Sequence, residues 1–337
     1  LEDLFDLAPA ALACDVHPSY LSGQWAREQA RKCNLPLVEV QHHHAHIASV
    51  MAEAIAAGQL TTDARVLGIA FDGTGAGTDG TIWGGEFLVA SLGGFERAAH
   101  LRTWALPGGA ASVRDARRNA FALLSELGLL EHPGAARLLD SLDEQTRSVT
   151  ATMIERGINS PRTSSMGRLF DAAAAILGIC DKATYEGEPA IELEAAAWRA
   201  LDNEIAHFPD DNAGYFASGP SWLDGPYVLD QKALFEALLG GIEAGAPADR
   251  LALDFHVAVA RSSARIATEI CVREGIGTVA LSGGVFMNRL LLQLLTRELK
   301  SAGFTVLVPH TVPVNDGCIA YGQAAVARTR LAQIASQ

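Results

Sequence analysis

The sequence has little of what marks several large classes of protein. Its five cysteines are scattered and none forms a C-x-x-C pair, so the pattern indicates neither a disulfide framework nor a thiolate zinc site. No apolar run approaches the roughly 20 residues that a membrane-spanning helix needs. The net charge is −13 and the chain holds only four lysines, so it would repel nucleic-acid phosphates. We therefore expect a cytoplasmic protein with no membrane and no nucleic acid among its partners.

Common nucleotide and catalytic motifs are also absent. The chain contains no G-x-x-x-x-G-K-[ST] phosphate loop and no G-x-S-x-G nucleophile turn. Residues 75–80 match G-x-G-x-x-G, but a strand pattern follows at 81–88, where a dinucleotide site requires a helix. An EF-hand is excluded because Asp72 is not followed by Asp or Asn two residues later.

What is present is the pattern of an α/β protein. With 337 residues, 49% of them apolar, the chain can bury a sizeable core in two lobes or subdomains. Strands are predicted at 11–17, 35–40, 66–71, 81–91, 278–281 and 304–308. Helices are predicted at 19–32, 42–57, most of 112–207 (with breaks at 133–134 and 159–161), from 231 to a break at 245–248, 250–274, 288–302 and from 316. Residues 208–230 are expected to be irregular. Because the chain begins with Leu1 rather than Met, we expect a piece of a longer protein without a signal peptide.

The most informative segment is the histidine cluster VQHHHAH at residues 40–46. If a helix begins near His42, then His42 and His46 lie one turn apart on one face. That spacing allows two imidazole nitrogens to bind one divalent metal. The alternative is a solvated helix start that is rich in histidine. Two imidazoles with carboxylate oxygens suit Fe, Zn or Mn, so the identity of the metal stays open.

Two glycine-rich segments predict a nucleotide site. Asp72-Gly73-Thr74-Gly75 lies between two strands, where glycines let backbone N–H groups approach an anion and Asp72 can hold a metal or water. The alternative is a plain glycine-rich hairpin. Residues 281–288, LSGGVFMN, end a strand and open a helix, so their two glycines would permit close approach of an adenosine, with Asn288 as a polar contact.

A carboxylate near the C-terminus can complete the metal site. Asp316 stands at the start of the last predicted helix, in Asn315-Asp316-Gly317. It can be an ordinary helix N-cap, or it can complete a set of two histidines and one carboxylate that leaves coordination positions open for substrate.

Six segments, in order, resemble the C-terminal catalytic region of the HypF family of [NiFe]-hydrogenase maturation carbamoyltransferases. They are VEVQHHHAHIASVMAE, GIAFDGTGAGTDGTIWGGEF, NSPRTSSMGRLFDAAAAILG, YEGEPAIELEA, LSGGVFMNRLLL and PVNDGCIAYGQAA. The resemblance covers nearly the whole chain and implies a two-lobed fold like that of actin, sugar kinases and chaperone ATPases (ASKHA), with a nucleotide and a metal in the cleft between lobes. We expect an N-terminal α/β lobe at 1–108, a largely helical connection at 109–210 and a nucleotide-binding lobe at 211–337.

The resemblance also implies a reaction. A carbamoyl group, activated with ATP as carbamoyl-adenylate in another domain, would pass to the C-terminal cysteine thiol of the partner maturation protein HypE. The product leads to the cyanide ligand of [NiFe] hydrogenase. The upstream acylphosphatase, zinc-finger and YrdC-like domains of the family leave no signature in this chain, so we expect them to be missing from it.

Carried over by position, the resemblance implies specific residues. His42, His46 and Asp316 are the implied catalytic residues and metal ligands, and Asp72 is a further ligand or one held through water. The implied nucleotide contacts are Asp72, Gly73, Gly75, Gly167, Asp171, Gly187, Gly283, Gly284 and Asn288. His43 and His44 point away from the ligand face and are left for substrate binding or packing. Glu188 and Cys318 depart from the family pattern, where Gln and Gly are expected, and neither is expected to touch the proposed ligands.

Other activities remain open at this point. A tRNA threonylcarbamoyl transferase or a small-molecule O-carbamoyltransferase would share the fold, although the negative charge counts against tRNA. A metal-dependent sugar or acid kinase would transfer phosphate instead, and a nucleotide-dependent binding module would carry out no chemistry.

Overall fold

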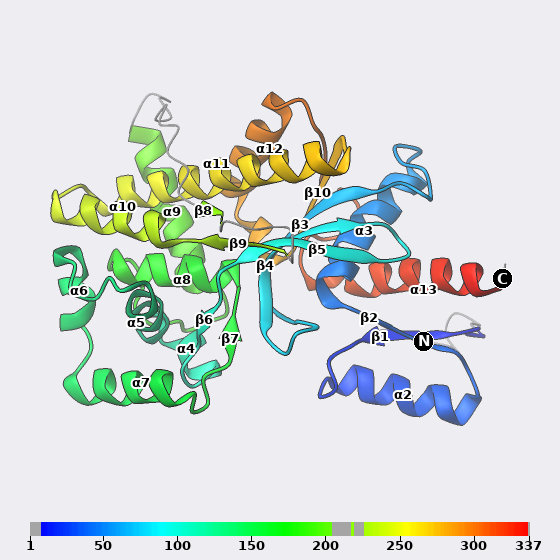
Figure 1. Ribbon diagram of the computed structural model, residues 1–337, viewed down its shortest axis with the longest axis horizontal. Coiled ribbons are helices and arrows are strands. Elements are labelled where there is room, and N and C mark those ends of the chain that lie inside the picture. Colours follow the sequence, from blue (N-terminus) through cyan, green and yellow to red (C-terminus); the bar gives the residue numbers. More distant parts are fainter. Residues whose placement is uncertain (1–7, 204–216, 219–225, 336–337) are drawn as a thin grey trace.

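A mixed nine-stranded sheet forms the centre of the computed structural model, which describes residues 8–203, 217–218 and 226–335 (Figure 1). Seven of its strands follow the order β11-β10-β3-β4-β5-β9-β8. Their bounds are β3 Val66–Ala76, β4 Ile82–Ala90, β5 Phe95–Leu101, β8 Ala217–Ser218, β9 Tyr227–Asp230, β10 Thr278–Ser282 and β11 Thr305–Leu307. The short strands β6 (Trp104–Ala105) and β7 (Arg162–Thr163) pair with each other, and β7 also pairs with β4.

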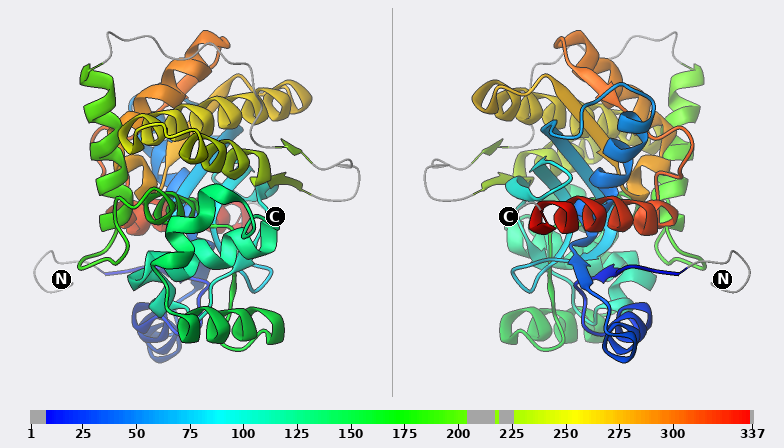
Figure 2. Two further views of the ribbon diagram at one scale, coloured as in Figure 1. Left: turned by 90° about the vertical axis from the view of Figure 1, so that its left-hand side faces the viewer. Right: turned by 90° about the vertical axis from the view of Figure 1, so that its right-hand side faces the viewer.

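The sheet is covered on both faces, because side chains along its central strands point alternately into two apolar cores. In β3, Leu67, Ile69 and Phe71 belong to the larger core, whereas Val66 and Ala70 belong to the smaller one. The larger core is completed by helices that include α8 (Met166–Ile176), α9 (Glu188–Asn203), α11 (Ala248–Glu274) and α12 (Arg289–Ser301), and the smaller core by α3 (His42–Ala56). Figure 2 shows α11 and α12 above the C-terminal helix α13 from both ends of the molecule.

A second, two-stranded sheet carries the start of the histidine helix. Strands β1 (Leu12–Asp15) and β2 (Leu37–Val40) are parallel and are connected by α2 (Leu21–Cys33). Helix α13 (Ile319–Ala335) packs on α3 so closely that a Cβ at Gly322 would lie 1.9 Å from the carbonyl oxygen of Ala45. Only glycine permits this crossing, which holds α3 against the C-terminal part of the chain.

A largely helical region lies between β6 and α11 and is interrupted by β7, β8 and β9. Its helices are α4 (Ala110–Arg114), α5 (Ala116–Leu127), the 3₁₀ turn η1 (Pro133–Ala135), α6 (Ala136–Asp140), α7 (Glu144–Arg156), α8, α9 and α10 (Lys232–Glu243). The predicted breaks at 133–134 and 159–161 are confirmed, since η1 begins at Pro133 and α7 ends at Arg156. No helix among the described residues combines the length and apolar character needed to cross a membrane.

The structure corrects three local predictions. Residues 72–75 are not the hairpin turn, because β3 continues to Ala76 through an irregularity between Phe71 and Gly75, and the turn lies at 77–81. Residues 227–230 are not irregular but form β9, which pairs with β5; the rest of the predicted irregular segment, apart from β8 and residue 226, lies outside the described residues. Strand β5 itself was not predicted, because charged side chains at Glu96 and Arg97 interrupt its apolar pattern.

The mixed α/β architecture is confirmed, and its sheet joins distant parts of the chain. Strand β10 pairs in parallel with β3, so strands on either side of the predicted boundary at residue 108 belong to one sheet. The three-part division at 108 and 210 therefore stays a prediction about lobes and does not describe this sheet.

Candidate metal and nucleotide site

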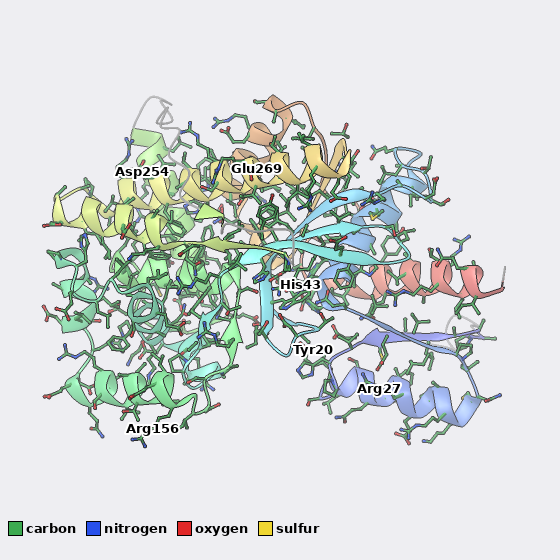
Figure 3. All side chains as sticks on the ribbon, in the orientation of Figure 1. Tyr20, Arg27, His43, Arg156, Asp254 and Glu269 are labelled. Atoms are coloured by element: carbon green, nitrogen blue, oxygen red, sulfur yellow. The ribbon has the colours of Figure 1, made fainter. Side chains whose placement is uncertain are left out.

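The first turn of α3 lies where the two sheets meet, and Figure 3 marks His43 in this region. Strand β2 ends at Val40, and the side chain of Gln41 caps α3 by accepting a hydrogen bond from the backbone N of His44 at 2.9 Å. The predicted helix start is thus confirmed. His42 and His46 lie one turn apart with ring centroids separated by 5.1 Å.

Four side chains from three separate parts of the chain converge on one point. His42 Nε2 lies 3.2 Å from Asp72 Oδ2, and His46 Nε2 lies 3.4 Å from Asp316 Oδ1. The crossed distances are 3.6 Å from His42 Nε2 to Asp316 Oδ1 and 3.7 Å from His46 Nε2 to Asp72 Oδ2. One potential ligand atom from each residue lies within 4.8 Å of all the others. We call His42, His46, Asp72 and Asp316 the four-ligand cluster.

The donor set fits a divalent metal. Both imidazoles present Nε2 to the carboxylates, and His46 Nε2 is buried without a hydrogen-bond partner within the described part of the chain. Two imidazole nitrogens with two carboxylate oxygens suit a first-row transition metal or zinc. A cation at the shared point would also neutralise the two carboxylates.

Further side chains orient the histidines from behind. His42 Nδ1 lies 3.0 Å from Asp15 Oδ2, the carboxylate–histidine arrangement that fixes the tautomer of a metal ligand. His46 Nδ1 lies 3.3 Å from both the hydroxyl of Ser282 and the thiol of Cys318. The backbone N–H of Gly284 donates to Asp72 Oδ1 at 3.0 Å, so the glycine turn after β10 positions the Asp72 carboxylate.

Two of these neighbours differ from what the sequence predicted. Asp15 was not singled out, although it ends a short strand and lies next to Val40 in the parallel register of β1 and β2, two residues before His42. Such a signal becomes visible only when the pairing is known. The expectation that Cys318 does not touch a proposed ligand is wrong, because its sulfur contacts His46.

Electrostatics in the cluster favour charged groups. Burial lowers the pKa of His42, but the carboxylates of Asp15, Asp316 and Asp72 outweigh it and raise that pKa to about 12. Burial also opposes protonation of His46, whose pKa is nevertheless raised to about 10, chiefly by Asp316 and Asp72. Hydrogen bonds from both histidines lower the pKa of Asp316, and Asp72 is lowered too despite its burial. Without a metal, protons balance the carboxylates, so a metal must displace protons from the histidines.

The two neighbouring histidines lie outside the cluster. His43 Nδ1 lies 3.0 Å from Gln41 Nε2 and its ring packs near Trp83, while burial lowers its pKa to about 3. His44 Nε2 donates to the carbonyl of Ser91 at 2.8 Å, and burial lowers the pKa of His44 to about 4. Both are therefore neutral side chains of the interior.

The glycines around Asp72 are required by close packing. A Cβ at Gly75 would lie 2.4 Å from Cε1 of His43, and a Cβ at Gly167 would lie 2.9 Å from the Cα of Gly73. The N-terminus of α8 is also tied to this strand, because the hydroxyl of Ser165 donates to the carbonyls of Asp72 and Gly73 at 2.9 and 2.8 Å. The predicted residues Gly73, Gly75 and Gly167 are thus brought together beside Asp72.

The turn after β10 reaches the same place. Gly283 has φ +113°, and a Cβ there would lie 2.2 Å from the carbonyl oxygen of Phe71. Asn288 caps α12 by accepting from the backbone N of Leu291 at 2.9 Å, and its Nδ2 lies 2.8 Å from His256 Nε2. The predicted nucleotide contact at Asn288 stays a prediction, while its structural role is to start α12.

The remaining predicted contacts lie at the junction of α8 and α9. Asp171 in α8 is buried, its Oδ2 lies 3.1 Å from Arg168 Nη2, and burial raises the pKa of its carboxyl. Gly187, with φ +79°, precedes that helix. The carboxylate of Glu188 accepts from the backbone N and the hydroxyl of Thr184. Glu188, which stands where the family pattern has Gln, is therefore held by Thr184 in the turn before α9 and lies away from the four-ligand cluster.

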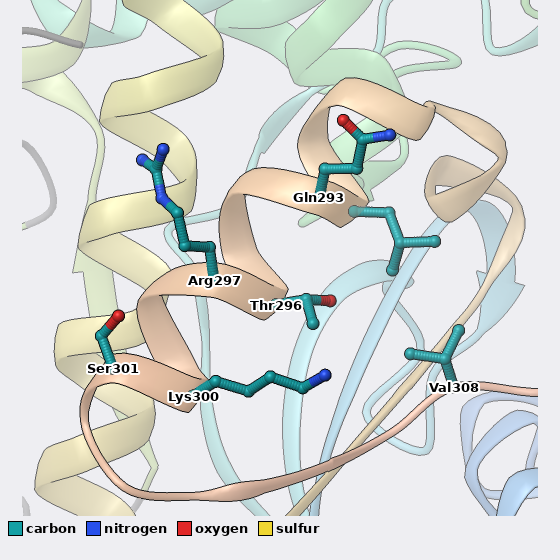
Figure 4. A pocket seen from close by; sticks show the side chains of 7 residues that line it. Gln293, Thr296, Arg297, Lys300, Ser301 and Val308 are labelled. Carbon is teal, nitrogen blue, oxygen red and sulfur yellow. The ribbon is translucent and has the colours of Figure 1, made fainter. Parts of the chain in front are cut away.

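A hollow of about 650 Å³ runs along the outer side of α12, beside Gln293, Thr296, Lys300 and Val308 (Figure 4). A second hollow of about 340 Å³ lies between α10 and α11. Neither contains a member of the four-ligand cluster, so the site is defined by its convergent side chains.

Comparison with known proteins identifies the family of this chain. The family described as "Carbamoyltransferase, Kae1-like Domain, second subdomain" matches residues 68–323, and "HypF Kae1-like domain" matches residues 1–53. A carbamoyltransferase HypF homolog of Cupriavidus necator is 40% identical over 97% of this chain and 80% of its own length. Carbamoyltransferase HypF of Synechocystis is 36% identical over 96% of this chain but only 40% of its own length.

Solved structures agree as well. A crystal structure of full-length HypF in the phosphate- and nucleotide-bound form matches 98% of this chain and 48% of its own, with a TM-score of 0.85 and 36% identity. A crystal structure of T. kodakarensis HypF matches 96% of this chain and 40% of its own, with a TM-score of 0.78 and 34% identity. With the motifs, the sheet and the four-ligand cluster in agreement, this chain belongs to the HypF family of carbamoyltransferases, of which it spans the Kae1-like region.

Proposed function

We propose that this chain transfers the carbamoyl group of carbamoyl-adenylate to the C-terminal cysteine thiol of HypE, on the way to the cyanide ligand of [NiFe] hydrogenase. The observation that carries the proposal is the convergence of His42, His46, Asp72 and Asp316 beside the glycines of β3 and the glycine turn after β10. The nucleotide in the related full-length HypF structure supports a nucleotide-binding role. The proposed compartment is the cytoplasm, in keeping with five unpaired cysteines.

The four-ligand cluster would hold a divalent metal of the class Fe, Zn or Mn. Such an ion, when bound, supplies Lewis acidity and a template for substrate oxygens. Asp15, Ser282 and Cys318 keep the imidazoles turned so that their Nε2 atoms face the shared point. Gly284 holds Asp72 through its backbone N–H, so the carboxylate is in place before substrate arrives.

The transfer step requires little further chemistry from the protein. The thiolate of the acceptor attacks the carbamoyl carbon, a C–S bond forms, and the bond from carbon to the phosphate oxygen breaks as AMP leaves with the electron pair. A deprotonated cysteine is already a strong nucleophile, so positioning of the two reactants accounts for most of what the site must do. The thiol proton is lost to solvent before attack.

The test is a reaction of the purified, metal-loaded chain with carbamoyl-adenylate and a peptide that ends in the acceptor cysteine. Mass spectrometry should show a peptide thiocarboxamide and stoichiometric AMP. A phosphorylated small molecule would indicate a kinase instead. Bound nucleotide without any product would indicate a binding module, and either outcome contradicts the proposal.

The proposal concerns a part of a longer activity, because the chain spans about 40% of the length of most of the HypF relatives it matches. Synthesis of carbamoyl-adenylate is assigned to the upstream acylphosphatase, zinc-finger and YrdC-like domains. Supplying carbamoyl phosphate and ATP in place of carbamoyl-adenylate should therefore give no thiocarboxamide with this chain alone.

A further inference from the structure

Arg168 is a buried cation whose hydrogen-bonding capacity is mostly unused. It lies in the first turn of α8 and is 5% exposed. Its Nη2 forms an ion pair with Asp171 Oδ2 at 3.1 Å, but Nε and Nη1 are buried without a hydrogen-bond partner among the residues described. A guanidinium carries five N–H donors, and leaving them unmatched in the interior is costly. Such a group normally meets a ligand or an ordered water.

A partly buried arginine, Arg97 on β5, shows what full pairing looks like in this protein. Arg97 Nε lies 2.6 Å from Glu86 Oε2, its Nη1 lies 2.9 Å from Asp79 Oδ2, and its guanidinium stacks on Trp83 at 3.9 Å. That arginine has a structural role, because it ties β5 to the turn and to the second strand of the β3–β4 hairpin. Arg168 has one ion pair by comparison, so a purely structural role leaves more of its donors unexplained.

The guanidinium of Arg168 faces the glycine segment next to the four-ligand cluster. The nitrogen that faces it is Nη2, the one paired with Asp171, which lies 3.7 Å from the position that a Cβ on Gly73 would take. Among the described residues, no other heavy atom beyond the adjoining ones lies within 4 Å of that position. Gly73 directly follows Asp72, and the hydroxyl of Ser165 ties both to the start of α8. The space over Gly73 is therefore open, with the Arg168 guanidinium beside it and Asp72 of the four-ligand cluster adjoining it in the chain.

We propose that Arg168 binds an anionic phosphate oxygen of the nucleotide in the space over Gly73. A guanidinium forms strong, short hydrogen bonds with phosphate, and the N-terminus of α8 adds positive potential in the same direction. The proposal rests on the proposed function in that the nucleotide is carbamoyl-adenylate or the AMP that it leaves. In this arrangement Arg168 selects the phosphate, while the turn after β10 lies toward the nucleoside.

The test compares AMP with adenosine, because the two ligands differ only in the phosphate. Calorimetric titration of the full, metal-loaded chain should show tighter binding of AMP. Arg168→Met should weaken AMP binding about 10- to 100-fold, the range for a lost charged hydrogen bond, and should change adenosine binding less than about 2-fold. Arg168→Lys should fall between, because it keeps the charge but not the planar fork. Arg156→Met, at an exposed arginine of α7, is the control and should leave both affinities unchanged.

Folding and metal content are measured in each variant. Metal content should not change, because among the described residues Arg168 pairs with Asp171 and not with a cluster histidine. Stability should fall in Arg168→Met, because the buried Asp171 carboxylate loses its partner, so affinities are compared only in variants that fold. Should Arg168→Met not fold, the double variant Arg168→Gln with Asp171→Asn removes both charges at once, and the preference for AMP over adenosine should fall by the same factor. An unchanged preference in the folded variant overturns the role of Arg168 and leaves the proposed function intact. A wild-type chain that binds neither ligand overturns both, whereas an Arg168-dependent preference without carbamoyl transfer overturns the proposed function alone.

Discussion

The two sides of the four-ligand cluster are built differently. His42, His46 and Asp72 are buried ligands on α3 and β3, held by a helix and a central strand. Asp316 reaches the same point from the short turn η3 (Asp316–Cys318), and its side chain is 70% exposed. The buried side is fixed by the core of the protein, whereas the exposed side depends on how the preceding loop is held.

That loop is anchored by the helix that carries the histidines. Glu53 lies in α3, and its carboxylate accepts hydrogen bonds from the backbone N–H groups of His310 and Thr311 at 2.9 and 2.8 Å and from Val312 at 3.3 Å. Those bonds lower the pKa of Glu53 in spite of the opposing effect of burial. One helix thus supplies two ligands directly and controls the approach of a third. The difference between the sides can be tested by changing each in turn.

Loss of a buried ligand should have the largest effect. In His46→Ala the metal affinity should fall more than about 100-fold, and carbamoyl transfer should be lost. That loss exceeds the one expected for a residue that only hydrogen-bonds to a metal ligand. Metal content by atomic emission and transfer by mass spectrometry are the readouts. His310→Ala, which alters an exposed histidine, is the matched control. Survival of both metal and transfer in His46→Ala would show that the cluster is not the metal site.

Loss of the exposed ligand should have a smaller effect. Asp316→Asn keeps the shape but removes the charge, and we expect metal affinity to fall about 10- to 100-fold with little change in melting temperature, because exposed substitutions rarely destabilise. Asp72→Asn should both weaken the metal and lower the melting temperature, since it breaks buried contacts to His42 and Gly284. Equal effects of the two substitutions on stability would abolish the distinction between the sides.

The pH dependence of stability and of metal affinity should come from the two buried histidines of the cluster. The raised pKa values of His42 and His46, about 12 and about 10, mean that their protonation stabilises the metal-free fold below the ordinary value near 6.5. That contribution is lost as pH rises through about 10 for His46 and about 12 for His42. Metal binding displaces these protons, so metal affinity should rise with pH by about tenfold per pH unit for each proton released. Calorimetry in buffers of different ionisation enthalpy counts the protons, and a count of zero would contradict the assignment.

Weakening the hydrogen bonds of Glu53, which hold the loop before Asp316, should reduce metal affinity less than the loss of a ligand does. In Glu53→Gln the three backbone donors lose a charged acceptor, and we expect metal affinity to fall about 3- to 10-fold through greater freedom of the loop before Asp316. Glu28→Gln, at an exposed glutamate of α2, controls for the change in net charge. Combining Glu53→Gln with Asp316→Asn should add little, because both act on one ligand. Full additivity would mean that Glu53 acts elsewhere.

The smallest effect on metal affinity is expected from changing Cys318, which contacts Nδ1 of His46. Cys318→Gly restores the residue that the family pattern predicts and removes one neighbour of Nδ1, but Ser282 remains at 3.3 Å. Metal affinity should therefore change only about 2- to 3-fold, which is less than the usual effect of removing a residue that hydrogen-bonds to a metal ligand. Metal titration of the Cys318→Gly chain measures it, with Ser282→Ala as the companion variant. A larger loss in Cys318→Gly than in Ser282→Ala would make the thiol the main support of His46.

Local sequence patterns predicted the parts of the site that depend on neighbours along the chain. The spacing of His42 and His46 is a property of one helix turn, and the helix starts at the predicted residue. The glycines of residues 72–75 were predicted to let the backbone approach an anion, which stays a prediction; the structure places them beside Asp72 in a strand irregularity instead of a turn. The strand–helix junction at Gly283 and Gly284 was predicted for the same reason.

Contacts between distant segments were beyond the reach of these patterns. Asp15 meets His42 only because β1 and β2 pair in parallel, and Cys318 meets His46 only because the start of α13 crosses α3 at Gly322. Strands β5 and β9 escaped prediction because their pairing, and not their apolar pattern, makes them strands.

The sequence by itself determined which residue types are available to the site, namely two histidines at helical spacing, two aspartates and the glycines beside them. Helical periodicity and backbone freedom are local properties, so they can be seen without knowing the fold. Only the tertiary structure decided that Asp72 and Asp316 reach the same point, that Asp15 supports His42, and that Arg168 faces Gly73. These are contacts between segments far apart in the chain, and only the packing of the core brings such segments to one place.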